Sequence, residues 1–134
     1  MTGAAPTARA TERPSRRAVA LALGFDIVLV IAFAAVGRAS HDSDVWTGLA
    51  QTAWSFLVGL AAGWLVTRAW RAPAAPVRTG LGVWAVTVAG GMLLRAASGQ
   101  GTAIAFIVVA AVTLLVALVG WRVIAAAVRR ARRR

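Results

Sequence analysis

The sequence predicts an all-α membrane protein, a bundle of four transmembrane helices with both termini in the cytoplasm. Three observations support this prediction: an apolar composition, four apolar segments of spanning length, and a one-sided distribution of arginine. Hydrophobic residues make up 60% of the 134 residues and charged residues only 14%, and the mean hydropathy is +0.75. A soluble domain of this size needs more polar surface than that, so the apolar side chains must face lipid.

Four segments have about the ~20 residues that a helix needs to cross the hydrocarbon layer. They are apolar on all sides, and the alternating pattern of a β-barrel is absent. Pro73 and Pro76 fall between the second and third segments, where a helix must break. The predicted spans cover residues 18–37, 48–69, 79–96 and 102–124.

The length of the chain allows one domain, which we place at residues 18–124. Residues 1–17 are small, polar and basic, and they predict a disordered N-terminal arm. Residues 125–134 predict a basic C-terminal tail.

The distribution of arginine predicts the orientation of the spans. All fifteen basic residues are arginines, and with the N-terminus inside, thirteen of them fall in cytoplasmic segments. Positive residues gather at the cytoplasmic ends of membrane helices, so we expect a multi-pass protein of the cell membrane. The basic ends should attract anionic lipid headgroups rather than nucleic acid. Trp121 falls at an inner boundary, where indole rings prefer the headgroup level.

The composition argues against an enzyme. The chain has no cysteine, one histidine and four acidic residues, which excludes thiolate chemistry and leaves little material for a catalytic triad or a metal cluster. We therefore expect no enzymatic activity, no metal and no cofactor.

Small residues form a stripe along the second span. Ser55, Gly59 and Gly63 recur every four residues, and Gly91 belongs to a comparable stripe in the third span. Small side chains let helix backbones approach closely in lipid. We expect this face to be used for packing within the bundle, and the alternative use is a homodimer face made by Gly59 and Gly63.

One acidic residue, Asp26, lies inside the first span, eight residues from its predicted cytoplasmic edge. A carboxylate at that depth should face the bundle interior or a water-filled cavity. Arg38 and Arg95 lie too far towards the outer side, so we expect Asp26 to have no cationic partner. Neutral partners at a suitable depth are Thr87, Trp84 and Trp64.

Two interpretations of Asp26 stay open. A neutral carboxyl that hydrogen-bonds between helices would hold the bundle together, which suits a structural or accessory membrane protein. A carboxyl that exchanges a proton or binds a cation would suit a small proton-coupled transporter or channel.

A second polar cluster falls at the outer end of the bundle. Arg38 and Arg95 end the two outward-running spans, and His41, Asp42 and Asp44 lie in the loop after the first. Long arginine side chains can reach the interface from such positions, so ion pairs with the loop acids are expected. The alternative is an extracellular site for an anion or a headgroup, in which His41 would add pH sensitivity.

Asp26 is followed along the chain by five short motifs: GRASH (37–41), WSF (54–56), GMLLR (91–95), AFIVVA (105–110) and GWR (120–122). With these motifs the chain resembles small actinobacterial membrane proteins grouped as domain of unknown function 3054, over roughly residues 20–124. The resemblance implies an integral membrane protein and no particular activity, substrate or catalytic residue.

Overall fold

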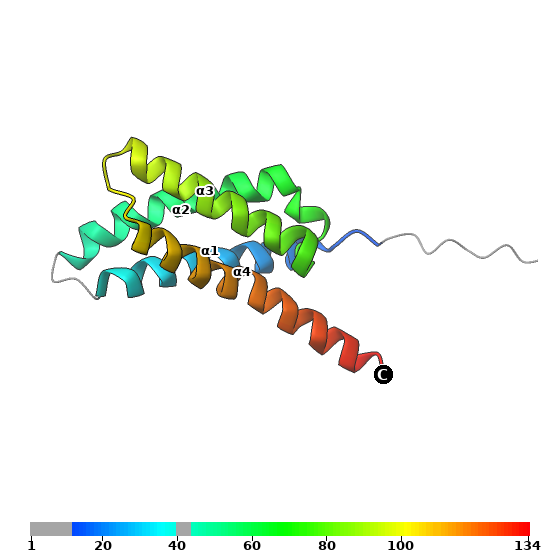
Figure 1. Ribbon diagram of the computed structural model, residues 1–134. Coiled ribbons are helices and arrows are strands. Elements are labelled where there is room, and N and C mark those ends of the chain that lie inside the picture. Colours follow the sequence, from blue (N-terminus) through cyan, green and yellow to red (C-terminus); the bar gives the residue numbers. More distant parts are fainter. Residues whose placement is uncertain (1–11, 40–43) are drawn as a thin grey trace, which may run out of the picture.

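The computed structural model describes residues 12–39 and 44–134, which form helices and connections without a strand. The four long helices are α1 (Arg16–Ala39), α2 (Val45–Thr67), α3 (Gly82–Ala97) and α4 (Ile104–Arg132), arranged as one bundle (Figure 1). Two short helical segments, η1 (Ala69–Arg71) and η2 (Pro76–Leu81), connect α2 with α3.

Each predicted span corresponds to a helix that is long and apolar enough to cross a membrane. α3 alone has 16 residues, or ~24 Å at about 1.5 Å per residue, which is short for a hydrocarbon core of ~30 Å. η2 runs directly into α3, and together they form an apolar run of 22 residues from Pro76. The prediction of an all-α protein with four membrane helices is confirmed, and the orientation of the termini stays a prediction.

The first and last helices extend beyond the predicted spans. α1 begins at Arg16, where the side chain of Ser15 accepts a hydrogen bond from the N–H of Ala18 at 3.1 Å and caps the helix. α4 has 29 residues and continues to Arg132, so most of the predicted tail is helical. Its C-terminal end extends beyond the rest of the bundle in Figure 1. Residues 1–11 of the predicted arm lie outside the described residues.

α2 and α3 approach each other closely because small residues line their contact. A Cβ atom at Gly59 would lie 2.7 Å from the carbonyl oxygen of Thr87, and one at Gly91 would lie 2.4 Å from the ring of Phe56. Gly63 faces the backbone of α3 in the same way. The small-residue face of α2 therefore packs inside the bundle, and α3 occupies it.

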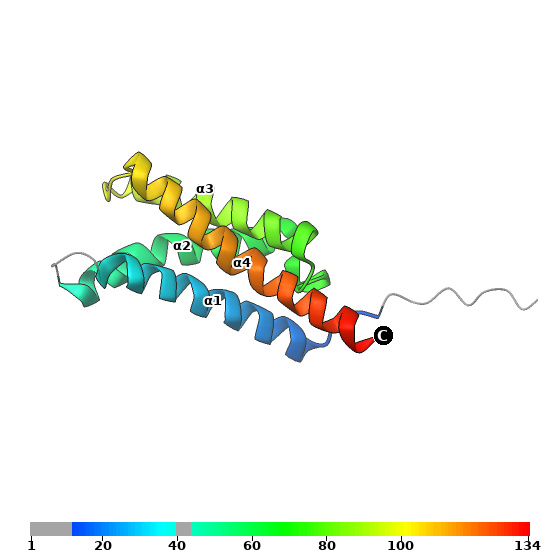
Figure 2. The ribbon, with the colours of Figure 1, turned by 60° about the horizontal axis from the view of Figure 1, so that its bottom comes forward.

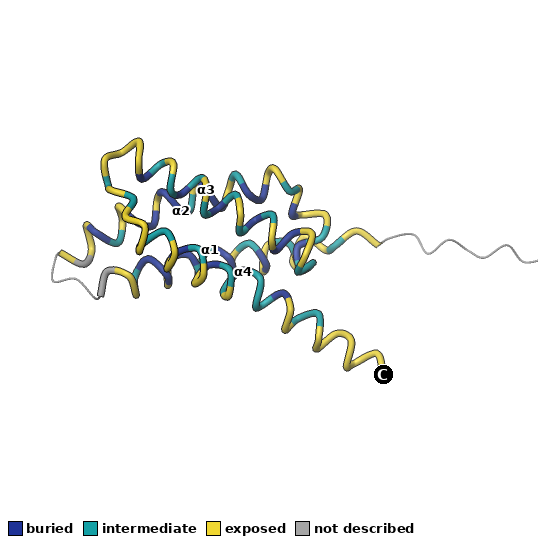
Figure 3. The backbone as a smooth tube through the Cα atoms, in the orientation of Figure 1, coloured by how far each residue is buried: buried dark blue, intermediate teal, exposed yellow. Residues whose placement is uncertain are grey.

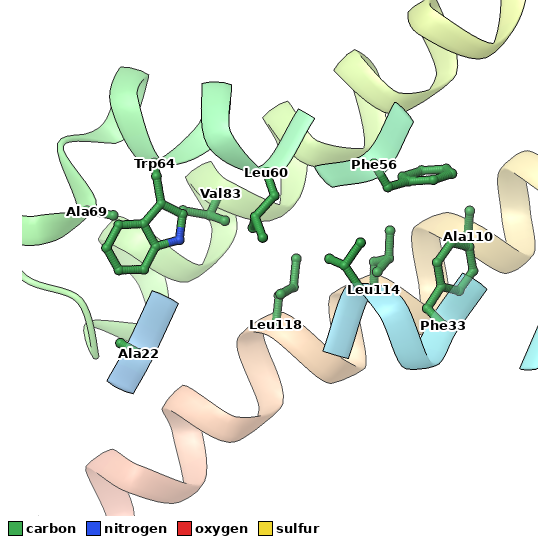
Figure 4. Packing of buried hydrophobic residues seen from close by; sticks show 11 residues of the cluster. Ala22, Phe33, Phe56, Leu60, Trp64, Ala69, Val83, Ala110, Leu114 and Leu118 are labelled. Carbon is green, nitrogen blue, oxygen red and sulfur yellow. The ribbon is translucent and has the colours of Figure 1, made fainter. Parts of the chain in front are cut away.

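The core lies between the four helices. Phe33 and Phe56 meet edge to face at one end, with ring centroids 5.2 Å apart, and Trp64 lies at the other end (Figure 4). Aliphatic side chains fill the space between them: Leu60, Leu114 and Leu118.

Outward-facing positions of the helices are largely apolar. On α4, Val108, Val112 and Val116 are each more than half exposed, and Figure 3 shows exposed positions along the outer sides of the helices and over the end of α4. Such a surface suits contact with lipid.

Candidate functional site

Asp26 and Arg122 form a two-point ion pair inside the bundle. Arg122 Nη2 donates to Asp26 Oδ2 at 2.6 Å, and Arg122 Nη1 donates to Asp26 Oδ1 at 2.9 Å. Both side chains are 0% exposed. A planar guanidinium matches a carboxylate in this way through two parallel hydrogen bonds. The prediction that Asp26 lacks a cationic partner is therefore wrong.

Two tryptophans complete the hydrogen bonding of Asp26. Trp64 Nε1 donates to Oδ2 at 2.9 Å, and Trp121 Nε1 donates to Oδ1 at 2.8 Å. Each carboxylate oxygen thus accepts two hydrogen bonds. An ionised carboxylate is an acceptor only, so four donors aimed at Asp26 fit that form.

Two further donors of Arg122 bind backbone carbonyls. Nε donates to Pro73 O at 2.9 Å, and Nη1 also donates to Leu118 O at 2.7 Å. Gly80 makes room for the side chain, because a Cβ there would lie 3.2 Å from Arg122 Cδ. The pair consequently joins α1, α2, α4 and the α2–α3 connection at one point.

The carbonyls of four consecutive residues in that connection, 72–75, each accept a hydrogen bond. In order, the donors are Thr79 Oγ1 at 2.6 Å, Arg122 Nε at 2.9 Å, Arg129 Nη2 at 3.3 Å and the N–H of Gly80 at 3.0 Å. Backbone carbonyls that lie outside a regular helix need such partners wherever they are removed from water. The connection is therefore held against α4 by two arginines.

Asp26 and Arg122 lie at matching depths. Asp26 is ten residues after the start of α1 at Arg16, and Arg122 is ten residues before the end of α4 at Arg132. Both are thus ~15 Å from the basic ends of their helices, at about 1.5 Å per residue. Those two ends lie on the same side of the bundle (Figure 2).

Trp84 and Thr87, the other two expected partners, do not hydrogen-bond to Asp26. Trp84 Nε1 donates to Ala111 O at 2.8 Å. The Thr87 hydroxyl is buried and has no hydrogen-bond partner among the described residues. Of the three neutral partners expected, only Trp64 reaches the carboxylate.

Arg95, at the predicted outer end, is held by the loop between α3 and α4. Its side chain is 7% exposed and donates to Gln100 Oε1 at 3.1 Å, Gln100 O at 3.3 Å and Gly101 O at 3.3 Å. Its guanidinium carbon lies 4.3 Å from the ring centroid of Phe106, within the range of a cation–π contact. Gly99 and Gly101 have φ angles of +70° and +82°, a conformation that favours glycine.

The rest of the predicted outer cluster is described only in part. Asp44 accepts a hydrogen bond from Thr47 Oγ1 at 3.0 Å at the start of α2. His41, Asp42 and the side chain of Arg38 lie outside the described residues. A cavity of about 230 Å³ lies beside Arg95. Within residues 12–39 and 44–134, no three His, Cys, Asp or Glu side chains are placed to hold a metal ion.

Comparison with known proteins confirms the family that the sequence motifs indicated, and the actinobacterial origin stays a prediction. The model of a family described as "Protein of unknown function (DUF3054)" matches residues 23–125. The match spans Asp26, Trp64, Trp121 and Arg122, and thus the whole of the buried site. Comparisons with curated proteins and with solved structures gave no match. The chain belongs to the DUF3054 family, whose function is unknown.

Proposed function

We propose that this chain is a structural or accessory protein of the cell membrane, without enzymatic or transport activity. The observation that supports this proposal is the hydrogen bonding and complete burial of the Asp26 carboxylate. Its two oxygens accept four hydrogen bonds from Arg122, Trp64 and Trp121, and the side chain is 0% exposed.

A proton-coupled site must gain and lose its proton and must connect with water. Protonating Asp26 would leave Arg122 as a buried cation without a counter-charge. A buried charge that has lost its partner is strongly unfavourable. This cost disfavours a transport cycle in which Asp26 changes its protonation at every turn.

The same geometry favours a structural role. Polar contacts between membrane helices hold them together, and a buried polar group can fix the register of a helix pair. Here one carboxylate on α1 meets its partner on α4 at a single depth. The pair would therefore set how the first helix lies against the last, giving a rigid body that a partner could recognise.

Purified protein in liposomes tests the absence of transport. With a pH gradient applied, we expect the proton flux to match that of protein-free liposomes, for the native chain and for Asp26→Asn alike. A flux present in the native protein and lost in Asp26→Asn would overturn the proposal in favour of a small proton-coupled transporter or channel.

A second experiment covers substrates that the flux measurement would miss. Double variants that neutralise both partners, Asp26→Asn with Arg122→Gln and Asp26→Leu with Arg122→Leu, are introduced into a strain lacking the gene. If the pair acts only in structure, a double variant that accumulates and unfolds like the native chain restores the native phenotype. A well-folded double variant that fails to restore it would assign a chemical role to the pair.

A further inference from the structure

An open groove of about 800 Å³ lies beside the ion pair, between α1, the 72–75 connection and α4. Its volume falls within the ~300–1,000 Å³ of small-molecule sites, which are mostly apolar with a few polar groups. Leu21 and Phe25 of α1, Pro73 of the connection and Trp121 of α4 form its apolar wall, and Arg129 is its charged residue.

One residue that lines the groove, Trp121, also contacts the ion pair. Phe25 and Trp121 meet edge to face with ring centroids 5.4 Å apart, and Trp121 donates its N–H to Asp26. The carboxylate itself is 0% exposed. A ligand in the groove therefore meets apolar rings and not the Asp26 charge.

Arg129 gives the groove its positive charge. This residue is exposed, and its hydrogen bond to Ala74 O at 3.3 Å uses one of five guanidinium N–H donors. The adjoining ends of α1 and α4 carry seven more exposed arginines against one acidic residue, Glu12, in the described part of the chain: Arg13, Arg16, Arg17, Arg130, Arg132, Arg133 and Arg134.

We propose that this groove binds one anionic phospholipid, with an acyl chain along the apolar wall and the phosphate against Arg129. The acyl chain of such a lipid matches the apolar wall of the groove, and its phosphate matches the charge of Arg129. Basic pockets between membrane helices are a known way to hold anionic headgroups, and the surplus of arginine around this groove selects a lipid of net negative charge over a zwitterionic one. The inference goes beyond the proposed function and holds whether or not the protein transports anything.

Native mass spectrometry of the full chain, extracted from vesicles of phosphatidylglycerol and phosphatidylcholine, tests the proposal. We expect one phosphatidylglycerol to be retained per chain, at least tenfold in preference to phosphatidylcholine. Two variants should abolish this preferential retention: Arg129→Gln, which removes the charge, and Ala18→Phe, which fills the groove from α1. Ala18 and Arg129 line the groove and are exposed. Ala18→Phe should leave thermal unfolding in detergent unchanged, and Arg129→Gln should lower the unfolding temperature only slightly, because it removes one exposed hydrogen bond to Ala74 O.

Arg130→Gln is the matched control, because it makes the same charge change at the neighbouring exposed arginine, outside the groove lining. It should retain the lipid. Equal losses in Arg129→Gln and Arg130→Gln would overturn the proposal in favour of diffuse attraction to the basic ends. Retention unaffected by Ala18→Phe would place the lipid elsewhere. The native chain could instead form a dimer without lipid. If Ala18→Phe dissociated that dimer, the groove would be assigned to a second copy of the chain.

Discussion

Asp26 and Arg122 contact each other through two hydrogen bonds although 96 positions separate them in the chain. A lone charge at the centre of a membrane helix costs ~2.5–3.5 kcal/mol on insertion scales. By meeting inside the bundle, the carboxylate and the guanidinium present the lipid with no net charge. The pair also closes the bundle, because it ties the first helix to the last.

We expect Asp26→Asn and Arg122→Gln each to lower the free energy of unfolding by about 3–5 kcal/mol, because each leaves one buried charge uncompensated. The double variant removes both charges, so its loss should be smaller than the sum of the two single losses. Unfolding in mixed micelles by added dodecyl sulfate measures the three values and the coupling between the sites.

Arg130→Gln and Asp44→Asn, at exposed positions in α4 and directly before α2, serve as controls. They should change the same free energy by no more than ~0.5 kcal/mol. Losses in Asp26→Asn and Arg122→Gln that simply add in the double variant would contradict a direct pair.

Trp121→Phe should lower the free energy of unfolding more than Trp84→Phe does. Both indoles are half-buried and donate one hydrogen bond, Trp121 to the Asp26 carboxylate and Trp84 to the carbonyl of Ala111. Hydrogen bonds to charged groups contribute about 1.5–3 kcal/mol and neutral ones about 0.5–1.5 kcal/mol. The same titration measures both, and Trp46→Phe, at a 79% exposed position, gives the baseline. Equal losses at 84 and 121 would show that the acceptor's charge contributes nothing.

The four helices were predictable because spanning length and apolar composition are properties of single segments. Pro73 and Pro76 likewise mark the break between α2 and α3. The Asp26–Arg122 pair was not predicted, because the depth of a residue in the bundle is estimated from its distance to the end of its helix, and the end of the fourth helix was placed too early. A fourth span ending at residue 124 put Arg122 two residues from the cytoplasmic edge, far shallower than Asp26. Once α4 is known to continue to Arg132, the two depths agree.

Trp121 was missed for the same reason, since an indole next to a predicted helix end is expected at the headgroup level. The sequence did contain a usable signal. A helix whose last turns carry several arginines can continue through them, and the acid of the first span then falls level with the GWR segment (120–122) of the last. The spacing of Ser55, Gly59 and Gly63 predicted a packing face, but no spacing within α2 could identify α3 as the helix that covers it.

Gly59→Ala and Gly91→Ala should each lower the free energy of unfolding by about 1–3 kcal/mol, the usual cost of overpacking. The added methyl group would lie 2.7 Å from Thr87 O in the first case and 2.4 Å from the Phe56 ring in the second. Gly24→Ala and Gly120→Ala are matched controls within helices, because nothing lies within 4 Å of a Cβ atom there. Alanine is favoured over glycine inside a helix by roughly 0.5–1 kcal/mol, so both controls should be neutral or stabilising. Destabilisation at 24 and 120 equal to that at 59 and 91 would remove the α2–α3 contact as its cause.

The orientation can be tested with single cysteines, since the chain has none of its own. With thirteen arginines on the predicted inner side and two at the outer ends, the positive-inside bias predicts cytoplasmic termini. In intact cells, a membrane-impermeant maleimide should label Asp44→Cys and leave Glu12→Cys and Ala131→Cys unlabelled, and all three positions are exposed in the structure. Permeabilised cells provide the control, because all three cysteines should then react. Labelling of Glu12→Cys and Ala131→Cys in intact cells, with Asp44→Cys protected, would reverse the topology. The buried ion pair would then lie nearer the outer surface, and the lipid proposed for the groove would come from the outer leaflet.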